Sequence, residues 1–207
     1  MKIGIVGSGN VGATLGRRLA EAGHTVVFGT RRPDSPVMRE LAQIPGARVA
    51  ANAEAAQASE VIILATPWPA TEDAIRGLGD LSGKVLLDCT NPLKPTLDGL
   101  ELGVTTSAGE MVAQWAAGAR VVKIFNSIGY NIMANPAFPG GPATLFYCGD
   151  DASAKKTAHD LAAQLGFDPV DAGRLSQARL LEPFALLWIS LAFGGQGREI
   201  AFHLMKR

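Results

Sequence analysis

The sequence has few of the side chains that bind metals or form disulfide bonds. Its 207 residues include two cysteines and three histidines, and no cysteine or histidine lies at ligand spacing from Cys89 or Cys148. Both cysteines end apolar runs, so we predict that they are reduced thiols in the core of a cytoplasmic protein. This scarcity argues against a disulfide scaffold, and we predict no metal site.

The chain also lacks an excess of charge and a long apolar run. Lys plus Arg and Asp plus Glu number 19 each, a balance that favours neither nucleic acid nor an anionic membrane as a partner. The longest apolar stretch, Pro183 to Phe193, is shorter than the roughly 20 residues of a membrane helix. The glycine-rich turn begins at Gly7, too early in the chain to leave room for the apolar region of a signal peptide. We therefore predict a cytoplasmic protein that binds a small molecule.

What the sequence does contain is a regular alternation of short apolar runs and helical patterns. Hydrophobic residues make up 47% of the chain and there are 24 glycines. This alternation is typical of βαβ units, so we predict an α/β, Rossmann-like, doubly wound and mostly parallel sheet. The expected strands are Lys2 to Val6, Thr25 to Gly29, Glu60 to Ala65, Lys84 to Asp88, Arg120 to Phe125, Thr144 to Cys148 and Asp168 to Asp171.

Helical patterns fill the intervals between these strands. The clearest are Val11 to Ala22, Ala70 to Leu78, Gly109 to Ala117 and Ala152 to Leu165, the last capped by Asp150 or Asp151. Glu182-Pro183 is expected to open a further helix, which is apolar nearly all round and must therefore be buried, against the substrate pocket or a second subunit. A final amphipathic turn is expected at Arg198 to Lys206. We predict one NADP-binding domain over residues 1–207, with 182–207 as a C-terminal helical segment.

A glycine-rich turn follows the first expected strand. Gly7, Ser8, Gly9, Asn10, Val11 and Gly12 match the pattern G-x-G-x-x-G, with a strand before the turn and a helix after it. The first glycine allows the turn, the second lets the backbone approach a pyrophosphate, and the third lets helix and strand pack closely. The pyrophosphate would lie at the positive end of the helix. The alternative is a tight turn with no ligand.

The end of the second expected strand indicates which dinucleotide is bound. NAD-binding domains usually carry an acid about 20 residues beyond the glycine loop, whereas this chain has Thr30, Arg31 and Arg32. A hydroxyl and two guanidinium groups suit a 2′-phosphate, and an arginine can also stack on adenine. Ser35 could add a hydroxyl, while Asp34 is expected to cap a helix that begins near Pro36. These residues predict NADP(H) as the cofactor; the alternative is a solvated turn.

The nicotinamide end of the site is expected where later strands end, because ligands of parallel sheets bind outside their carboxyl ends. Three segments end there: Ala65 to Trp68, Cys89 to Pro92 and Phe125 to Gly129. We predict that Thr66, Pro67, Trp68, Asn91 and Asn126 contribute to this pocket. For Trp68 and Asn126 the alternative is a role in turns and packing.

No catalytic residue is identified. Tyr130 is not followed by lysine four residues later, as in short-chain dehydrogenases, because Ala134 stands there. The histidines are scattered and are expected at the surface or at helix ends. Lys123 lies in an apolar strand, where it could orient a cofactor or form a salt bridge. The lack of acid/base groups points to an acceptor such as a flavin-type ring, for which hydride transfer depends on proximity and orientation.

Several motifs along nearly the whole chain resemble a known family. The glycine loop with Thr30-Arg31-Arg32, Thr66-Pro67-Trp68, Val122 to Asn126, Cys148 to Asp151, Asp171-Ala172-Gly173 and Leu180 to Pro183 together resemble the NADPH:coenzyme F420 oxidoreductases. The Lys-Ile-Phe-Asn stretch is also similar to the reductase domain of the six-transmembrane metalloreductases.

The resemblance implies a small Rossmann enzyme, dimeric, that moves hydride between NADPH and coenzyme F420, a deazaflavin, or a flavin as co-substrate. It also implies that Thr66, Asn91 and Asn126 surround the nicotinamide and that the chain after Gly197 borders the acceptor. The segment Asn126 to Tyr130 and Trp188 depart from the family. Two alternatives remain, an imine reductase resembling pyrroline carboxylate reductase and a protein that senses NADP(H) without turnover.

Overall fold

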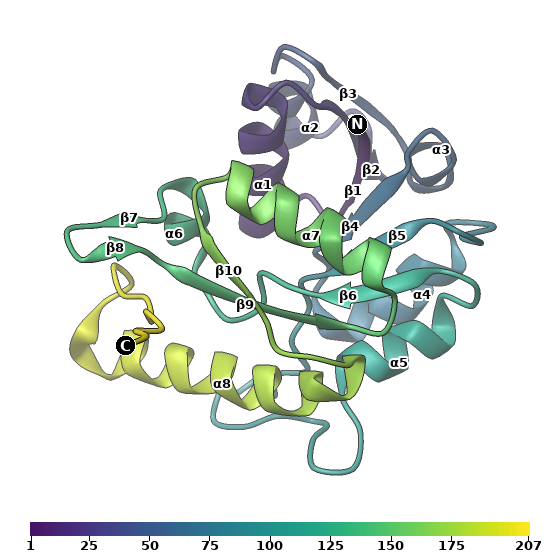
Figure 1. The fold of residues 1–207 in the computed structure, drawn as a ribbon. Coiled ribbons are helices and arrows are strands. Elements are labelled where there is room, and N and C mark those ends of the chain that lie inside the picture. The colour runs from purple at the N-terminus through teal and green to yellow at the C-terminus, as the bar shows by residue number, and fades with distance from the viewer.

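The computed structural model describes all 207 residues and contains an eight-stranded sheet (Figure 1). The strands lie in the order β10-β9-β6-β5-β4-β1-β2-β3. Their bounds are β1 Lys2–Val6, β2 Thr25–Thr30, β3 Ala47–Ala51, β4 Val61–Leu64, β5 Val85–Asp88, β6 Arg120–Lys123, β9 Thr144–Gly149 and β10 Asp168–Asp171. All neighbours pair in parallel except β6 and β9, which are antiparallel. The Rossmann-like, mostly parallel sheet predicted from the sequence is confirmed.

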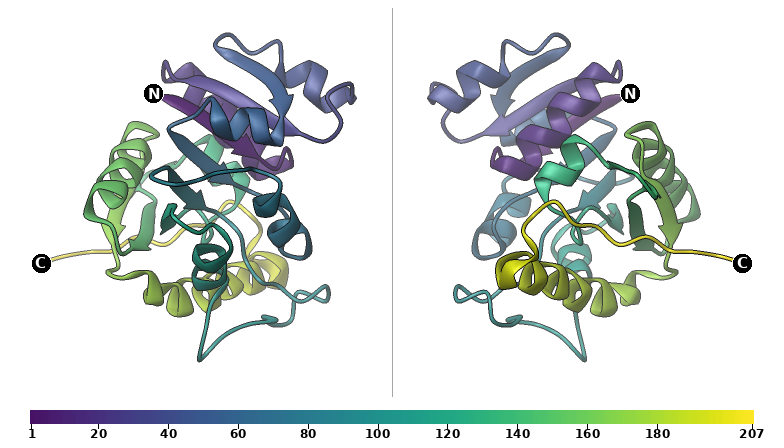
Figure 2. Two further views of the ribbon diagram at one scale, coloured as in Figure 1. Left: turned by 90° about the vertical axis from the view of Figure 1, so that its right-hand side faces the viewer. Right: turned by 90° about the vertical axis from the view of Figure 1, so that its left-hand side faces the viewer.

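Helices cover both faces of this sheet, as the two views of Figure 2 show. Their bounds are α1 Asn10–Glu21, α2 Pro36–Leu41, α3 Asn52–Gln57, α4 Thr71–Arg76, α5 Ala108–Trp115, α6 Tyr130–Ala134, α7 Ala152–Gln164 and α8 Ala178–Leu191. Alternate strand residues point to opposite faces. Ile5 and Ile63 therefore pack with α1, α2, α6 and α7, whereas Ile62 and Leu86 pack with α3, α4, α5 and α8.

The sheet reverses its strand order at β1. The chain runs from β1 outward to β2 and β3 and then returns to β4 on the other side of β1. The register aligns Val6 with Leu64, Leu64 with Asp88, and Asp88 with Lys123. The segments that follow these four strands therefore meet along one edge of the sheet, at the reversal point where doubly wound proteins bind ligands.

The strands and helices expected from hydrophobic patterns are present within a few residues of their predicted bounds. The elements β3 and α3 were missed because their residues Ala47 to Gln57 are mostly small or polar and show no apolar period. The short helix α6 and the hairpin of β7 (Ala137–Phe138) and β8 (Gly141–Pro142) were also not expected. Of the two proposed caps for α7, Asp151 is the cap, and it accepts a hydrogen bond from the Ala154 amide at 2.7 Å.

The C-terminal helix differs from its prediction at both ends. It begins at Ala178, ahead of Pro183, because Ala178 and Leu181 are already buried against the sheet. Within one chain this helix is only partly buried, with Leu187 48% and Phe193 65% exposed, so burial against a second subunit stays a prediction. By length and composition alone the helical stretch Leu175–Gln196 could cross a membrane, a test that buried helices also pass.

The residues after Gly197 are not helical, so the amphipathic turn expected at Arg198 to Lys206 is wrong. A π-helical turn, η3 (Ala192–Gln196), ends the helix. The chain then turns back along β9, where the Thr144 amide donates to the Phe202 carbonyl at 3.0 Å and the Leu204 amide to the Thr144 hydroxyl at 2.9 Å. Figure 2 shows the last residues extending away from the body of the molecule.

Both cysteines lie in the core as free thiols, as predicted. Burial raises the pKa of Cys148 to about 12 and also raises the pKa of Cys89. Because the thiolate is the reactive form, we expect the folded protein to show no fast-reacting thiol with a disulfide reagent at pH 8. Both thiols should react once the protein is unfolded in urea. Rapid labelling of the folded protein would contradict this arrangement.

Candidate cofactor and active site

The glycine turn connects β1 to α1 and requires glycine at two positions. Gly7 has a φ of +106°, and a Cβ there would lie 2.4 Å from the Ala65 carbonyl oxygen. A Cβ on Gly12 would lie 1.8 Å from the Gly7 oxygen. The turn therefore presses against β4 on one side and against α1 on the other. By contrast, a Cβ on Gly9 would meet no atom within 4 Å, so this glycine faces open space.

Alanine substitutions at Gly12 and at Gly9 are therefore predicted to have different effects. We expect Gly12→Ala to destabilise the protein by about 1 to 3 kcal/mol, the range for overpacking. Gly9→Ala should change stability by less than about 0.5 kcal/mol, as an exposed substitution does. It should nevertheless weaken NADPH binding, because the methyl group fills space that a pyrophosphate needs. Urea unfolding and NADPH titration of both variants measure these effects; equal behaviour would contradict the distinction.

A cavity of about 830 Å³ lies beside this turn, between the β2–α2 segment and α4. It brings together many residues that the sequence predicted for the cofactor: Gly7, Ser8, Thr30, Arg31, Arg32, Ser35, Thr66 and Pro67. Gly9, Asn10, Val11 and Gly12 do not line the cavity and form the adjoining start of α1. The cavity thus continues the turn toward the end of β2.

The two arginines of the cavity are exposed and have no ionic partner. Neither guanidinium group makes a hydrogen bond or a salt bridge, whereas the Arg32 amide donates to the Thr30 hydroxyl at 3.0 Å. The cap of α2 is Ser35, which accepts from the Met38 amide at 3.4 Å, so the assignment of this role to Asp34 is wrong. Asp34 instead binds Arg39 through its carbonyl oxygen, which leaves its carboxylate outside the helix.

Two polar side chains that line the cavity were missed by the sequence analysis. Asn52 begins α3, and its Oδ1 atom is buried without a hydrogen-bond partner. Asp73 lines the cavity from α4. No local pattern marked Asn52, because the preceding strand β3 had itself not been recognised.

These features fit a phosphorylated dinucleotide. The first turn of α1 contains no acidic residue, and its N-cap Gly9 has no side chain to bind the free amides. Such amides, with the positive end of a 12-residue helix, suit a pyrophosphate. The unpaired Arg31 and Arg32, with the hydroxyl of Thr30, suit a 2′-phosphate because guanidinium groups pair with phosphate oxygens.

Trp68 does not line this cavity. Its ring stacks on Trp115, with centroids 5.3 Å apart and planes at 29°. Thr66, in the same segment, shares a hydrogen bond of 2.9 Å with the hydroxyl of Thr71. Trp68 thus makes a packing contact and Thr66 lines the cavity, while the role of Trp68 in a nicotinamide pocket stays a prediction.

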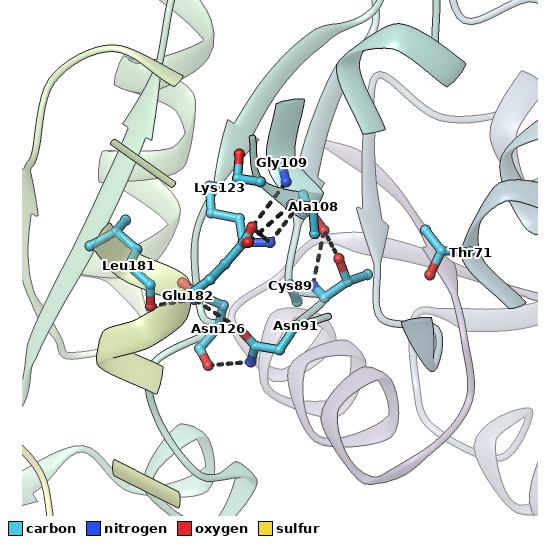
Figure 3. A network of polar contacts seen from close by, with 12 residues as sticks. Thr71, Cys89, Asn91, Ala108, Gly109, Lys123, Asn126, Leu181 and Glu182 are labelled. Carbon is cyan, nitrogen blue, oxygen red and sulfur yellow. Dashed lines mark hydrogen bonds and ion pairs between the residues drawn. The ribbon is translucent and has the colours of Figure 1, made fainter. Parts of the chain in front are cut away.

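Asn91 and Asn126 lie next to each other although they follow different strands (Figure 3). The Asn91 Nδ2 atom donates to the Asn126 carbonyl at 2.8 Å, and the Asn126 Nδ2 atom donates to Asn91 Oδ1 at 3.1 Å. Asn126 also donates to the Leu181 carbonyl of α8 at 2.9 Å. Asn126 is 5% exposed and Asn91 is partly exposed. Asn91 is therefore the member of the pair that a ligand can reach, and Asn126 supports it.

A buried ion cluster lies directly behind this pair. The Lys123 ammonium is 2.9 Å from Asp88 Oδ2 and 2.9 Å from Glu182 Oε1, and all three side chains are at most 1% exposed. Burial lowers the pKa of Lys123, but the charges and hydrogen bonds of Asp88 and Glu182 outweigh it, so the pKa is raised. Of the two roles considered for Lys123, the structure shows the salt bridge.

The histidines lie elsewhere. His24 contacts Gln164 at 2.7 Å, His159 contacts the Tyr147 hydroxyl at 3.2 Å, and His203 contacts the Pro142 carbonyl at 3.1 Å. Among the three segments at the sheet edge, the sole titratable side chain is that of Cys89, whose pKa is raised by burial. The edge thus offers amides and hydroxyls for binding.

The fold and cavity define a dinucleotide-binding protein, and comparison with known proteins makes its class more specific. Residues 2–92 match the family model "NADP oxidoreductase coenzyme F420-dependent". The F420-dependent NADP reductase of Methanothermobacter marburgensis is 33% identical, covering 92% of each chain. A proposed F420-dependent NADP reductase from Arthrobacter sp. FB24 superposes with a TM-score of 0.91 and 32% identity over 100% of both chains.

These matches identify an NADP-dependent oxidoreductase. The chain belongs to the family of coenzyme F420-dependent NADP oxidoreductases. Metalloreductase STEAP3 of Rattus norvegicus is 34% identical over 89% of this chain, which spans 36% of that relative's length. A reductive aminase from Aspergillus terreus shares the fold, with a TM-score of 0.68 at 24% identity over 62% of its length.

Proposed function

We propose that the protein transfers hydride between NADP(H) and a deazaflavin or flavin-type ring. The observation that carries the proposal is the combination of a cavity with two unpaired arginines and three sheet-edge segments whose sole titratable side chain, Cys89, is buried. NADPH supplies a hydride from its nicotinamide when bound. A ring acceptor needs little acid/base assistance, whereas a carbonyl or an imine needs a proton from the site. The names of the relatives support a deazaflavin.

In this proposal the chain binds and orients its cofactor. Arg31 and Arg32, with Thr30 and Ser35, hold the 2′-phosphate end. Gly9 and the first amides of α1 hold the pyrophosphate. The partly exposed amide of Asn91 binds the carboxamide of the nicotinamide, and Asn126 keeps that amide in place. The protein's contribution to the rate would be the alignment of two rings.

An acceptor panel tests the proposal. Purified protein is mixed with NADPH and coenzyme F420, FMN, FAD, a ferric chelate or a cyclic imine, and NADPH oxidation is followed by its absorbance. We expect oxidation with the deazaflavin or a flavin. Turnover with the imine alone would support the imine reductase alternative. NADPH binding without oxidation by any acceptor would support a sensor.

The expected homodimer and the division of the chain stay predictions. Helix α8 presents Leu180, Leu187 and Leu191 to solvent, and η3 presents Phe193, which is consistent with a second copy covering this helix. Light scattering after size-exclusion chromatography measures the mass. The mass of a monomer would contradict both the homodimer and the covering of α8 by a second copy.

A further inference from the structure

The buried ion cluster and the asparagine pair are joined through the backbone. Asp88 ends β5 and Asn91 follows three residues later, while Lys123 ends β6 and Asn126 follows three residues later. Both asparagines are thus held on short segments that leave the cluster. Figure 3 shows Glu182 and Leu181 reaching this place from α8.

The ion cluster joins β5, β6 and α8, which carry Asp88, Lys123 and Glu182. Glu182 accepts hydrogen bonds from the Ala108 and Gly109 amides, each at 3.0 Å, in addition to its contact with Lys123. Asp88 accepts from the Thr90 amide at 2.9 Å and from its hydroxyl at 2.7 Å. Because buried charges have no water to replace a lost partner, a network in which every charged side chain has a partner holds its geometry tightly.

A second connection runs from α8 directly to the asparagines. The Asn126 Nδ2 atom donates both to the carbonyl of Leu181, which is adjacent to Glu182, and to the Oδ1 atom of Asn91. Phe125, between Lys123 and Asn126, has a φ of +63°, a conformation that persists only where the surroundings enforce it. The Asn91 amide therefore depends on the position of α8.

We propose that Lys123, Asp88 and Glu182 are positioning residues that set the Asn91 amide for the carboxamide of the nicotinamide. This inference rests on the proposed NADP site. The cluster touches no ligand itself; it acts through the ends of β5 and β6 and through Leu181. Loosening it should release the nicotinamide half of the cofactor and leave the 2′-phosphate half bound.

The test uses Glu182→Gln, which keeps the shape of the side chain and removes one buried charge. Binding of 2′,5′-ADP, which lacks the nicotinamide, is compared with binding of NADPH, whose fluorescence reports how firmly the reduced ring is held. We expect the dissociation constant of 2′,5′-ADP to stay within about twofold and that of NADPH to rise about tenfold, equivalent to about 1.4 kcal/mol. The fluorescence anisotropy of bound NADPH should fall.

The matched control is Glu110→Gln, which removes the charge from the ion pair between α5 and α8. Glu110 binds Arg179 at 2.6 Å and makes no hydrogen bond to either asparagine. This control should leave both ligands and the anisotropy unchanged. Asp88→Asn provides a second test in case Glu182→Gln does not fold, which thermal melting shows, and it should give the same selective loss of NADPH.

Three results would overturn the inference. Wild-type NADPH affinity and anisotropy in folded Glu182→Gln and Asp88→Asn would show that the cluster does not position the amide. Equal weakening of both ligands would show a general structural role. Failure of the wild-type protein to bind 2′,5′-ADP would instead refute the NADP site on which the inference rests.

Discussion

Replacing Arg31 by alanine should weaken NADPH binding by about 1.5 to 3 kcal/mol, the range for a hydrogen bond to a charged group, and should leave NADH binding unchanged. The guanidinium group lines the cavity and has no partner in the protein, so no internal salt bridge is lost with it. NADH lacks the 2′-phosphate that the group would bind. Fluorescence titration with both cofactors measures the difference.

Arg48→Ala is the matched control for this prediction. Arg48 is an exposed arginine of β3 that pairs with Glu54 at 2.6 Å and does not line the cavity. Its removal should change neither affinity. Equal losses of NADPH and NADH in Arg31→Ala would mean that Arg31 stacks on the adenine and that the phosphate lies elsewhere. Repeating the titrations with Arg32→Ala would then show whether Arg32 binds the 2′-phosphate.

The end of the site that is predicted to bind the phosphate groups could be recognised because its sequence motifs are local in the chain. The turn from Gly7 to Gly12 and the segment from Thr30 to Arg32 each lie within a few residues, and the geometry of a βα unit fixes where they point. The cavity does bring Gly7, Thr30 and Arg31 together. Asn52 joins them from the start of α3, and the strand before it could not be recognised because Ala47 to Ala51 alternate weakly.

The nicotinamide end could be predicted less well because its contacts join distant segments. The sequence places Lys123 in an apolar strand, but its partners Asp88 and Glu182 belong to another strand and to α8. No spacing rule connects these positions. The same holds for the hydrogen bond between Asn126 and Leu181, which ties Asn126 to α8. The stacking of Trp68 on Trp115 could not be predicted for a related reason, since Trp115 lies on a separate helix.

Removal of the central cation should have the largest effect on stability. We expect Lys123→Met to lower the free energy of unfolding by about 3 to 5 kcal/mol, because it leaves the buried carboxylates of Asp88 and Glu182 without a counterion. Lys155→Met is the control, since Lys155 pairs with Asp171 at a partly exposed site. It should cost less than about 1 kcal/mol. Urea unfolding at pH 7 gives both values.

The pH dependence of stability provides an independent check on the same residue. The pKa of Lys123 is raised above its ordinary 10.5 in the folded protein, so its ion pairs contribute fully below that pH. This contribution is lost as the pH rises through the raised pKa, whereas Lys123→Met has no such group to lose. The stability gap between the two proteins should therefore narrow under strongly alkaline conditions. A gap that is constant with pH would mean that lost packing, and not the buried charge, destabilises the variant.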